Sequence, residues 1–265
     1  MKHSLILIDY SGTLTIGGMN FLKNDQANSL LDWELLNKFQ IPDMQTFWEQ
    51  LITPGWPKGA ISDVPYPQLL LEQTEKLNTI LYHQYSETLS RMFKQFCYAY
   101  FEAQLPAHQW IPVIKSLNSQ PSISVVICSD HYIDAAYYLL RYLREQGITC
   151  SFINPNVRHV DDHQVFLAFS SLFGHTKEEK AYWHVLNSSL TFVPSEILIV
   201  DDFGANECDL DTFSQPQQVT IRKQQILNHI KDVFAITPQC IQVEKMGDLS
   251  INNAIDIFRQ QFNVL

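Results

Sequence analysis

Three short apolar runs stand out along the chain, and none of them alternates regularly with polar residues. They are Leu5–Ile8, Ile123–Cys128 and Ile197–Val200. A continuous apolar run of this length is typical of a β-strand that is buried on both faces, as in a parallel sheet covered by helices. The pattern therefore predicts an α/β fold, in which a Rossmann-like parallel sheet carries helices on both faces.

Between the first two runs, apolar residues recur at helical spacing. Residues 28–39 predict one helix, residues 43–51 a second helix with Asp43 as its N-cap, and residues 69–101 two helices or one kinked helix. Prolines interrupt residues 54–67, which we expect to form a loop. We therefore expect an all-helical domain at 23–105, inserted into an α/β core formed by 1–22 and 106–265.

Three further segments carry strand or turn signals. Gly17-Gly18 lies between short apolar runs and predicts a β-hairpin. Residues 149–153 and 165–169 predict two strands, and the Asp161-Asp162 turn between them suggests an antiparallel pair. We also expect short strands at Val219–Ile221 and Cys240–Val243.

Each of the three buried runs leads into polar residues that are suited to chemistry. They are Asp9, then Ser129 and Asp130, then Asp201 and Asp202; Lys177 lies between the last two strands, ahead of a predicted helix. The carboxyl ends of parallel strands border the crevice in which open α/β sheets bind their ligands. We therefore expect these side chains to meet in one site.

Each of these residues also has an ordinary explanation when it is taken alone. Ser129 suits a helix N-cap, and Lys177 suits an exposed surface position, with Lys180 as a rival for its role. The receiver domains of response regulators use the same residue types. There, however, the acidic pair comes first, and the domain is about half the size of this chain. The joint order therefore argues against both coincidence and a receiver.

The order Asp9, Ser129, Lys177 and Asp201-Asp202 resembles the haloacid dehalogenase (HAD) superfamily. The helical insertion after the first motif resembles the cap of its phosphoserine-phosphatase-like branch. The resemblance implies that Asp9 is the nucleophile and forms an aspartyl-phosphate. It also implies that Ser129 and Lys177 contact the phosphoryl group, and that Gly12, Thr13 and Asp130 help to bind the substrate.

The resemblance further implies a bound Mg²⁺, which prefers oxygen ligands. The expected ligands are Asp9, Asp202 and the backbone carbonyl of Ser11. We expect Asp201 to act as a co-ligand or to support Asp202, and Asn206 or Glu207 to complete the shell.

Ser11 departs from the phosphatase pattern. Most phosphatases of the superfamily carry a second Asp two residues after the nucleophile, where it protonates the leaving group and then activates water. A serine hydroxyl is too weak an acid for this role, and general acid–base catalysis contributes roughly 10²–10⁴ in rate. Ser11 is thus expected to contribute little as a catalytic acid, although His131 or a substrate hydroxyl is a possible substitute.

We therefore predict a Mg²⁺-dependent hydrolase or phosphotransferase that acts slowly or atypically on a small phosphorylated molecule. Phosphoserine itself is not expected, because Gly18 and an Arg-free segment at 68–80 replace the residues that hold its amino-acid head. One alternative is hydrolysis of a C–halogen or C–P bond, the latter needing a lysine such as Lys23, Lys38, Lys58, Lys76 or Lys94. Another is a degenerate metal-binding or regulatory module.

Composition excludes several classes of function. The formal charge of −10 and the lack of a basic stripe argue against a nucleic-acid partner. No apolar run approaches the ~20 residues that span a bilayer, and Asp9 interrupts the first run too early for a signal peptide. The five cysteines are scattered and unpaired in spacing. We expect a cytoplasmic protein without a membrane partner; the sequence predicts no oligomeric state.

Overall fold

A six-stranded parallel sheet forms the centre of the computed structural model, which describes residues 3–23, 25–155, 165–207, 214–244 and 248–262. The strand order is β3-β4-β2-β1-β5-β6. The strands are β1 (Ser4–Asp9), β2 (Ile123–Ser129), β3 (Cys150–Phe152), β4 (Val165–Phe169), β5 (Glu196–Asp201) and β6 (Gln239–Gln242). The predicted parallel sheet is thereby confirmed.

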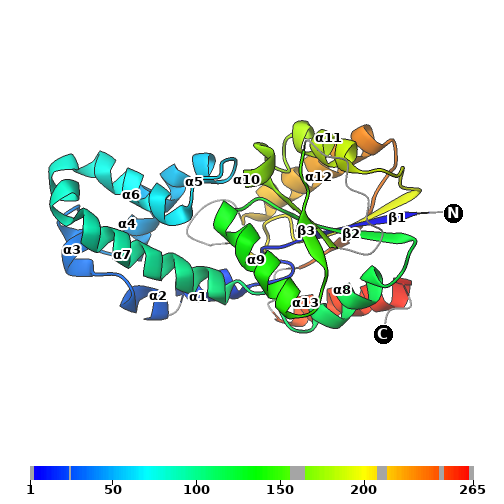
Figure 1. Ribbon diagram of the computed structural model, residues 1–265, viewed down its shortest axis with the longest axis horizontal. Coiled ribbons are helices and arrows are strands. Elements are labelled where there is room, and N and C mark those ends of the chain that lie inside the picture. Colours follow the sequence, from blue (N-terminus) through cyan, green and yellow to red (C-terminus); the bar gives the residue numbers. More distant parts are fainter. Residues whose placement is uncertain (1–2, 24, 156–164, 208–213, 245–247, 263–265) are drawn as a thin grey trace.

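Helices cover both faces of the sheet, as Figure 1 shows. Ile6 and Ile8 of β1 pack into the core cluster that contains side chains of α8, α9 and α13. Leu5 and Leu7 point to the opposite face and pack with side chains of α11 and α12. This explains the continuous apolar runs, because successive residues of a strand face opposite sides. The helices are α8 (Trp110–Asn118), α9 (Ile133–Glu145), α10 (Ser170–Phe173), α11 (Lys180–Ser189), α12 (Pro216–Phe234) and α13 (Asp248–Phe262).

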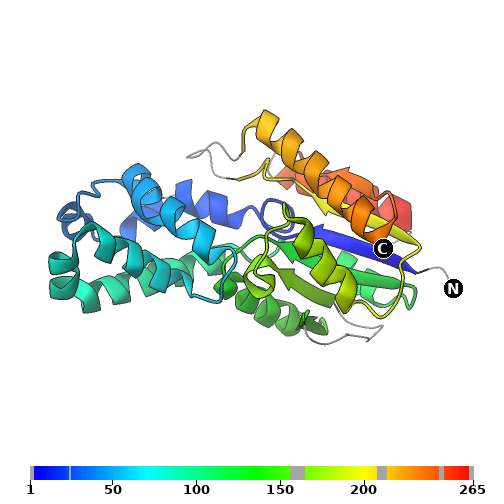
Figure 2. The ribbon, with the colours of Figure 1, turned by 90° about the horizontal axis from the view of Figure 1, so that it is seen from above.

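A helical segment connects β1 to α8 and extends away from one end of the sheet (Figures 1 and 2). It comprises α1 (Gly17–Lys23), α2 (Asp25–Ser29), α3 (Trp33–Asn37), α4 (Met44–Phe47), the π-helical turn η1 (Trp48–Ile52), α5 (Thr53–Gly59), α6 (Tyr66–Leu77) and α7 (Thr79–Ala103). It is anchored to the core where the Tyr66 N–H donates to Asp134 on α9, at 2.7 Å. That residues 23–105 form a separate domain stays a prediction.

Two details of the helical segment differ from the sequence expectation. The single helix predicted over 28–39 is broken, because the Asp32 side chain accepts a hydrogen bond from the Leu35 N–H at 3.0 Å and starts a new helix there. The loop predicted over 54–67 is helical in its first part as α5. Pro54 lies in the first turn of that helix, where a missing N–H is tolerated.

The hairpin predicted at Gly17-Gly18 is wrong, since both residues belong to α1. These glycines let α1 approach the end of α7 closely. A Cβ atom on Gly17 would lie 1.6 Å from the carbonyl oxygen of Ala103, and one on Gly18 would lie 2.3 Å from the side chain of Gln104. The sequence signal for a turn therefore came from a packing requirement.

Two strand predictions also fail. β3 pairs with β4 in parallel, with Cys150 opposite Val165. β4 is buried along its whole length, as is typical of a strand inside a parallel sheet. The predicted Asp161-Asp162 turn lies outside the described residues. Val219–Ile221 is part of α12, which buries Val219, Arg222, Ile226 and Ile230 at helical spacing, so that packing overrides the β-propensity of the run.

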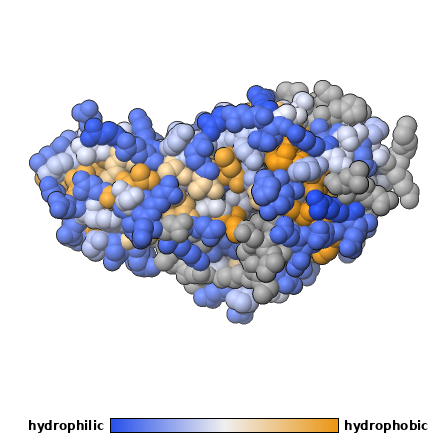
Figure 3. Space-filling model, turned by 90° about the horizontal axis from the view of Figure 1, so that it is seen from below, coloured by the Kyte–Doolittle hydropathy of each residue, from blue (hydrophilic) through white to orange (hydrophobic). Residues whose placement is uncertain are grey.

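The surface carries apolar side chains in several separate patches on the face seen in Figure 3. Exposed large apolar residues are scattered in the same way, among them Tyr98 on α7 and Tyr137 on α9. Within the described ranges, no helix combines the length and apolar character needed to cross a bilayer. The described thiols Cys97, Cys128, Cys150 and Cys240 are free.

Candidate active site

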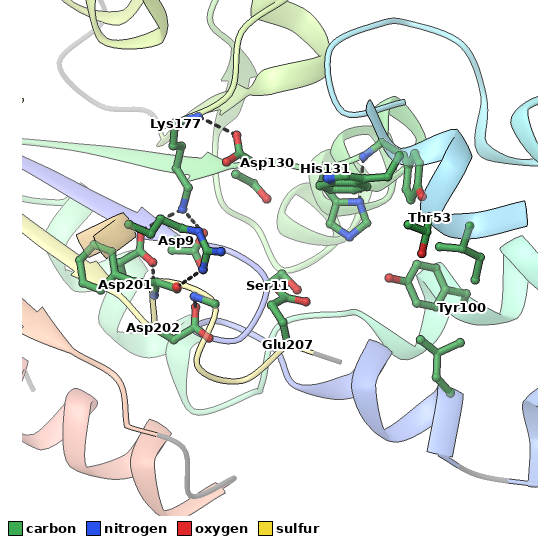
Figure 4. Close-up of a pocket in the computed structure, with 18 of the residues that line it drawn as sticks. Asp9, Ser11, Thr53, Tyr100, Asp130, His131, Lys177, Asp201, Asp202 and Glu207 are labelled. Carbon is green, nitrogen blue, oxygen red and sulfur yellow. Dashed lines mark hydrogen bonds and ion pairs between the residues drawn. The ribbon is translucent and has the colours of Figure 1, made fainter. Parts of the chain in front are cut away.

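The carboxyl ends of β1, β2 and β5 border a cavity of about 160 Å³. These three strands are neighbours in the sheet, so that Asp9, Ser129 and Asp201 end side by side. The helical segment lines the opposite side of the cavity (Figure 4). The structure thus brings together the residues that the sequence placed at three separate strand ends.

Lys177 joins two of these strand ends. Its Nζ atom lies 2.6 Å from Oδ1 of Asp9 and 2.8 Å from Oδ2 of Asp201. The lysine backbone is held in place as well, because its N–H donates to Oδ1 of Asp130 at 2.9 Å and its carbonyl accepts from Trp183 Nε1 at 2.8 Å. Lys180, the rival candidate, instead pairs with Asp232 at the surface.

Asp202 is fixed by hydrogen bonds to the β1 loop and within its own loop. Its N–H donates to Oγ1 of Thr13 at 3.0 Å, and its carboxylate accepts from the N–H groups of Gly204 at 3.1 Å and Asn206 at 2.6 Å. Gly12, with a φ of +78°, lies directly against this carboxylate: a Cβ there would be 2.3 Å from Oδ2. The β1 loop thus requires glycine at this position.

Three carboxylates form a cluster that suits a hard cation. One oxygen each from Asp9, Asp201 and Asp202 lies within 4.8 Å of the others, and all three residues are buried. Oδ2 of Asp9 is buried and makes no hydrogen bond, and the same is true of Oγ of Ser129. Buried polar atoms normally have a partner. Because carboxylate oxygens are the ligands that Mg²⁺ prefers, the residues fit the predicted ion.

The electrostatics of the cluster also favour a bound cation. Burial raises the pKa of Asp9 well above its usual range; Lys177 opposes that shift, while Asp201 and Asp202 add to it. Burial, followed by the charges of Glu207 and Asp201, raises the pKa of Asp202 to about 8. One ammonium group is therefore insufficient for three buried carboxylates, and a bound cation would stabilise their ionised forms.

Not every predicted site residue reaches the cavity. Ser11, Ser129, Asp130 and Lys177 line it, but Gly12, Thr13 and Asn206 do not. The Asn206 side chain donates to the carbonyl of Gly12 at 3.0 Å and so connects the β1 loop to the β5 loop. A substrate-binding role for Gly12 and Thr13, and a metal-binding role for Asn206, stay predictions.

The support of the β5 loop is not predictable from the sequence. Phe203 adopts a left-handed backbone conformation, with a φ of +53°, and its N–H donates to Oδ1 of Asp201 at 2.6 Å. Arg222 on α12 donates to the Phe203 carbonyl and pairs with Glu178 at 2.7 Å. Strained backbone persists only where its surroundings hold it. Nothing local in the sequence marks Arg222, because its contacts are distant along the chain.

The aromatic lining of the cavity was missed too. Trp48, Trp56, Tyr66 and Tyr100 of the helical segment all line the cavity. His131, which the sequence offered as a substitute acid or base, is 3% exposed. Burial lowers its pKa to about 3, so the ring is neutral at physiological pH. It is therefore unsuited to donate a proton to a leaving group.

Comparison with known proteins gives similarity in structure alone. No protein-family profile and no curated protein sequence matches the chain. The crystal structure of the L-2-haloacid dehalogenase PA0810 is similar at 13% identity and a TM-score of 0.53, over 98% of this chain and 99% of that one.

Two structures of the L-2-haloacid dehalogenase from Xanthobacter autotrophicus are also similar. The one with chloropropionic acid covalently bound has 9% identity and a TM-score of 0.46, over 99% of this chain and 84% of that one. The other has 10% identity and a TM-score of 0.47, over 98% of this chain and 88% of that one. These two scores are too low to support a fold by themselves.

Proposed function

Because the chain has the haloacid dehalogenase fold, as the sequence motifs predicted, we propose that it is a Mg²⁺-dependent hydrolase of small phosphomonoesters. The proposed reaction proceeds through an aspartyl-phosphate on Asp9. The fold alone does not select this reaction, since one fold supports many activities. The side chains at the ends of β1, β2 and β5 decide which chemistry the site supports.

The cluster of Asp9, Asp201 and Asp202 around Lys177 carries the proposal. Three carboxylates and one ammonium leave an excess of negative charge, which would repel an anionic substrate. A phosphoryl group is such a substrate, and it is accommodated only if a cation joins the site. Asp9, Asp202 and the Ser11 carbonyl are the proposed Mg²⁺ ligands. A bound Mg²⁺ would neutralise charge on the carboxylates and on the phosphoryl oxygens.

Three side chains have the remaining roles in the proposed reaction. Asp9 Oδ2 makes no protein hydrogen bond, so its lone pairs are available to attack phosphorus. Lys177 holds the other oxygen of Asp9 at 2.6 Å and orients the carboxylate. The unpartnered hydroxyl of Ser129 is positioned to donate to a phosphoryl oxygen.

Ser11 limits the rate of this reaction. It lines the cavity, and by the resemblance it takes the place of the acid that protonates the leaving group. Its hydroxyl cannot serve that purpose near neutral pH. The same lack slows the second step, in which water attacks the aspartyl-phosphate. We therefore expect the phosphoenzyme to accumulate during turnover.

Dehalogenation is the second candidate, and the names of the similar structures favour it. Those proteins are L-2-haloacid dehalogenases, which act on substrates that carry a carboxylate. In this chain the only lysine that lines the cavity, among the described residues, already pairs with Asp9 and Asp201. The buried acidic cluster would repel a haloacid carboxylate, so phosphoryl chemistry with a cation is the better fit.

The test is phosphate release from small phosphomonoesters with and without Mg²⁺, run beside halide release from 2-haloacids. We expect phosphate release that needs Mg²⁺ and is abolished in Asp9→Asn. Asp232→Asn, at an exposed ion pair, is the matched control and should keep wild-type activity. Metal-independent halide release, without phosphate release, would overturn the proposal in favour of dehalogenation.

A further inference from the structure

The wall of the cavity that faces the carboxylates is largely apolar and aromatic. The helical segment contributes Trp48, Ile52, Trp56, Tyr66 and Tyr100 to it, together with Leu22 and Thr53. None of the charged residues described in that segment lines the cavity. A wall of this kind binds an apolar ring through its faces and edges, and offers no counter-charge to a charged substrate group.

The aromatic rings of this wall hold one another in fixed positions. Tyr66 stacks on Tyr132 with ring centroids 4.0 Å apart, and Trp56 meets Tyr132 edge to face at 5.2 Å. A Cβ on Gly59 would lie 2.5 Å from the Tyr132 ring, so the backbone of α5 rests directly on that ring. The wall is therefore formed before any ligand arrives, which lowers the entropy cost of binding.

His131 adds an uncharged polar group between the wall and the carboxylates (Figure 4). Its Nδ1 accepts the N–H of Tyr132 at 2.9 Å, which places the ring proton on Nε2. Its ring lies 6.4 Å from that of Trp56 and 6.3 Å from that of Tyr100, measured between centroids. The imidazole thus presents a neutral donor among aromatic rings.

Size and charge restrict the substrate further. The cavity of about 160 Å³ is comparable to a cavity of roughly 150 Å³ that holds one benzene molecule. Its charged lining residues are Asp9, Asp130, Asp201, Asp202 and Glu207 against Lys177 and Arg222. Both cations are engaged by carboxylates of the protein, so a second anionic group on the substrate would meet net repulsion.

Ser11 provides an independent reason to expect an aromatic leaving group. Without a general acid, the leaving oxygen must depart as an anion. A phenol has a pKa near 10, as the tyrosine side chain does, so a phenolate leaves far more readily than an alkoxide. The aromatic wall and the missing acid therefore point to the same chemistry.

We infer that the site selects phosphomonoesters of uncharged phenols with a single ring, an inference that rests on the proposed phosphomonoester hydrolysis. The bond between Asp9 Oδ2 and phosphorus forms as the bond between phosphorus and the phenol oxygen breaks. The phenolate leaves and takes a proton from water. A water molecule then attacks the phosphorus of the aspartyl-phosphate, which yields inorganic phosphate and restores Asp9.

The test measures turnover, in the presence of Mg²⁺, of four substrates in which the aromatic ring and the quality of the leaving group vary independently. Phenyl phosphate has both features, benzyl phosphate has the ring alone, acetyl phosphate has a good leaving group alone, and ethyl phosphate has neither. We expect the highest kcat/KM for phenyl phosphate, with a burst of phenol that precedes steady phosphate release. Benzyl phosphate should bind with a similar dissociation constant, measured by single-turnover kinetics, but turn over more slowly and without a burst.

A pair of tryptophan variants assigns the ring preference to the wall. Trp56→Leu should raise KM for phenyl phosphate about 2- to 10-fold, the range expected for one lost aromatic contact, and leave KM for acetyl phosphate unchanged. Trp33→Leu is the matched control, since Trp33 is also half-buried in the helical segment but does not line the cavity. It should leave both values unchanged.

The possible failures are distinguishable. Turnover of phenyl and ethyl phosphate with equal kcat/KM would overturn the inference and leave the proposed function intact. If no ester is turned over, the proposed function fails, and calorimetry with phenylphosphonate and ethylphosphonate in Mg²⁺ then decides the selectivity. Tighter binding of phenylphosphonate, weakened by Trp56→Leu, would support a ring-selective site, and equal binding of the two would overturn it.

Discussion

Lys177 Nζ lies 2.6 Å from Oδ1 of Asp9, although the two residues are 168 positions apart in the sequence. Both side chains are almost fully buried, with 6% of Lys177 and 5% of Asp9 exposed. A buried pair of this kind loses the hydration of both charges, so each partner depends on the other. The contact therefore affects the stability of the fold as well as the orientation of the candidate nucleophile.

Replacement of Lys177 by methionine should lower both the stability of the fold and the rate of phosphate release. Loss of one partner leaves uncompensated buried carboxylates, which typically costs about 3–5 kcal/mol of the free energy of unfolding. Phosphate release should fall by about 10²-fold or more, because the charge that orients Asp9 is missing. Urea denaturation without Mg²⁺ measures the first effect, and initial rates with saturating Mg²⁺ measure the second.

Lys180→Met is the control for this change. Lys180 is three residues away and pairs with Asp232, but its side chain is 44% exposed. An exposed ion pair contributes about 0–1 kcal/mol, so stability should change little and activity should be retained. Equal effects of the two substitutions would show that the Lys177 contact has no special role.

Restoration of an acid at position 11 should accelerate turnover. Ser11→Asp places a carboxyl group at the edge of the cavity, where a general acid–base catalyst contributes roughly 10²–10⁴ in rate. Steady-state phosphate release should rise within that range, and the wild-type burst should disappear as the aspartyl-phosphate no longer accumulates. Ser11→Asn, which cannot transfer the proton, is the control; an equal gain with asparagine would contradict the acid–base explanation.

The sequence predicted the centre of this site because its signals there are local. A strand buried on both faces is recognisable from a short apolar run, and the polar residue that ends it must reach the carboxyl edge of the sheet, as Asp9 and Ser129 do. Position along a strand is sufficient for that inference, and no contact between distant residues has to be known.

The wall and the supports of the site were missed because they depend on tertiary contacts. Arg222 supports the β5 loop from α12, and Trp56 reaches Tyr132 from a segment that its prolines made look like a loop. Gly17 produced a false turn signal, because glycine is needed there for the close approach of Ala103. Such features are consequences of packing between distant elements, and a single sequence contains no local signal for them.

The buried His131 should make the fold sensitive to acid. In the unfolded chain the imidazole takes up a proton near its ordinary pKa of about 6.5, whereas burial lowers the pKa to about 3 in the folded protein. Below pH 6.5 the unfolded state therefore binds more protons, and stability falls as the pH falls towards 3. The loss that this residue alone causes at pH 5 is about 2 kcal/mol.

The difference in unfolding free energy between the wild type and His131→Phe isolates this effect from the titration of the nearby carboxylates. That difference should shrink by about 2 kcal/mol between pH 7.5 and pH 5, because the variant no longer loses stability through this group. His131→Gln keeps a polar side chain and should follow the same slope. A difference that is constant with pH would show that the imidazole is protonated equally in both states.

Alanine substitutions at Gly12 and Gly147 distinguish the cost of backbone strain from the cost of disturbing the site. Both have left-handed backbone angles, with φ of +78° and +75°, but a Cβ on Gly12 would lie 2.3 Å from Asp202 Oδ2 whereas nothing lies within 4 Å of one on Gly147. Gly147→Ala should therefore cost only the strain of about 1–2 kcal/mol that a left-handed alanine carries. Gly12→Ala should cost at least ~2 kcal/mol more, because the Asp202 carboxylate must leave its two N–H donors.

Gly12→Ala should also weaken Mg²⁺ binding, measured by calorimetry, while Gly147→Ala binds Mg²⁺ as the wild type does. Equal losses of stability and unchanged Mg²⁺ affinity in both variants would mean that the Asp202 carboxylate does not depend on the glycine beside it.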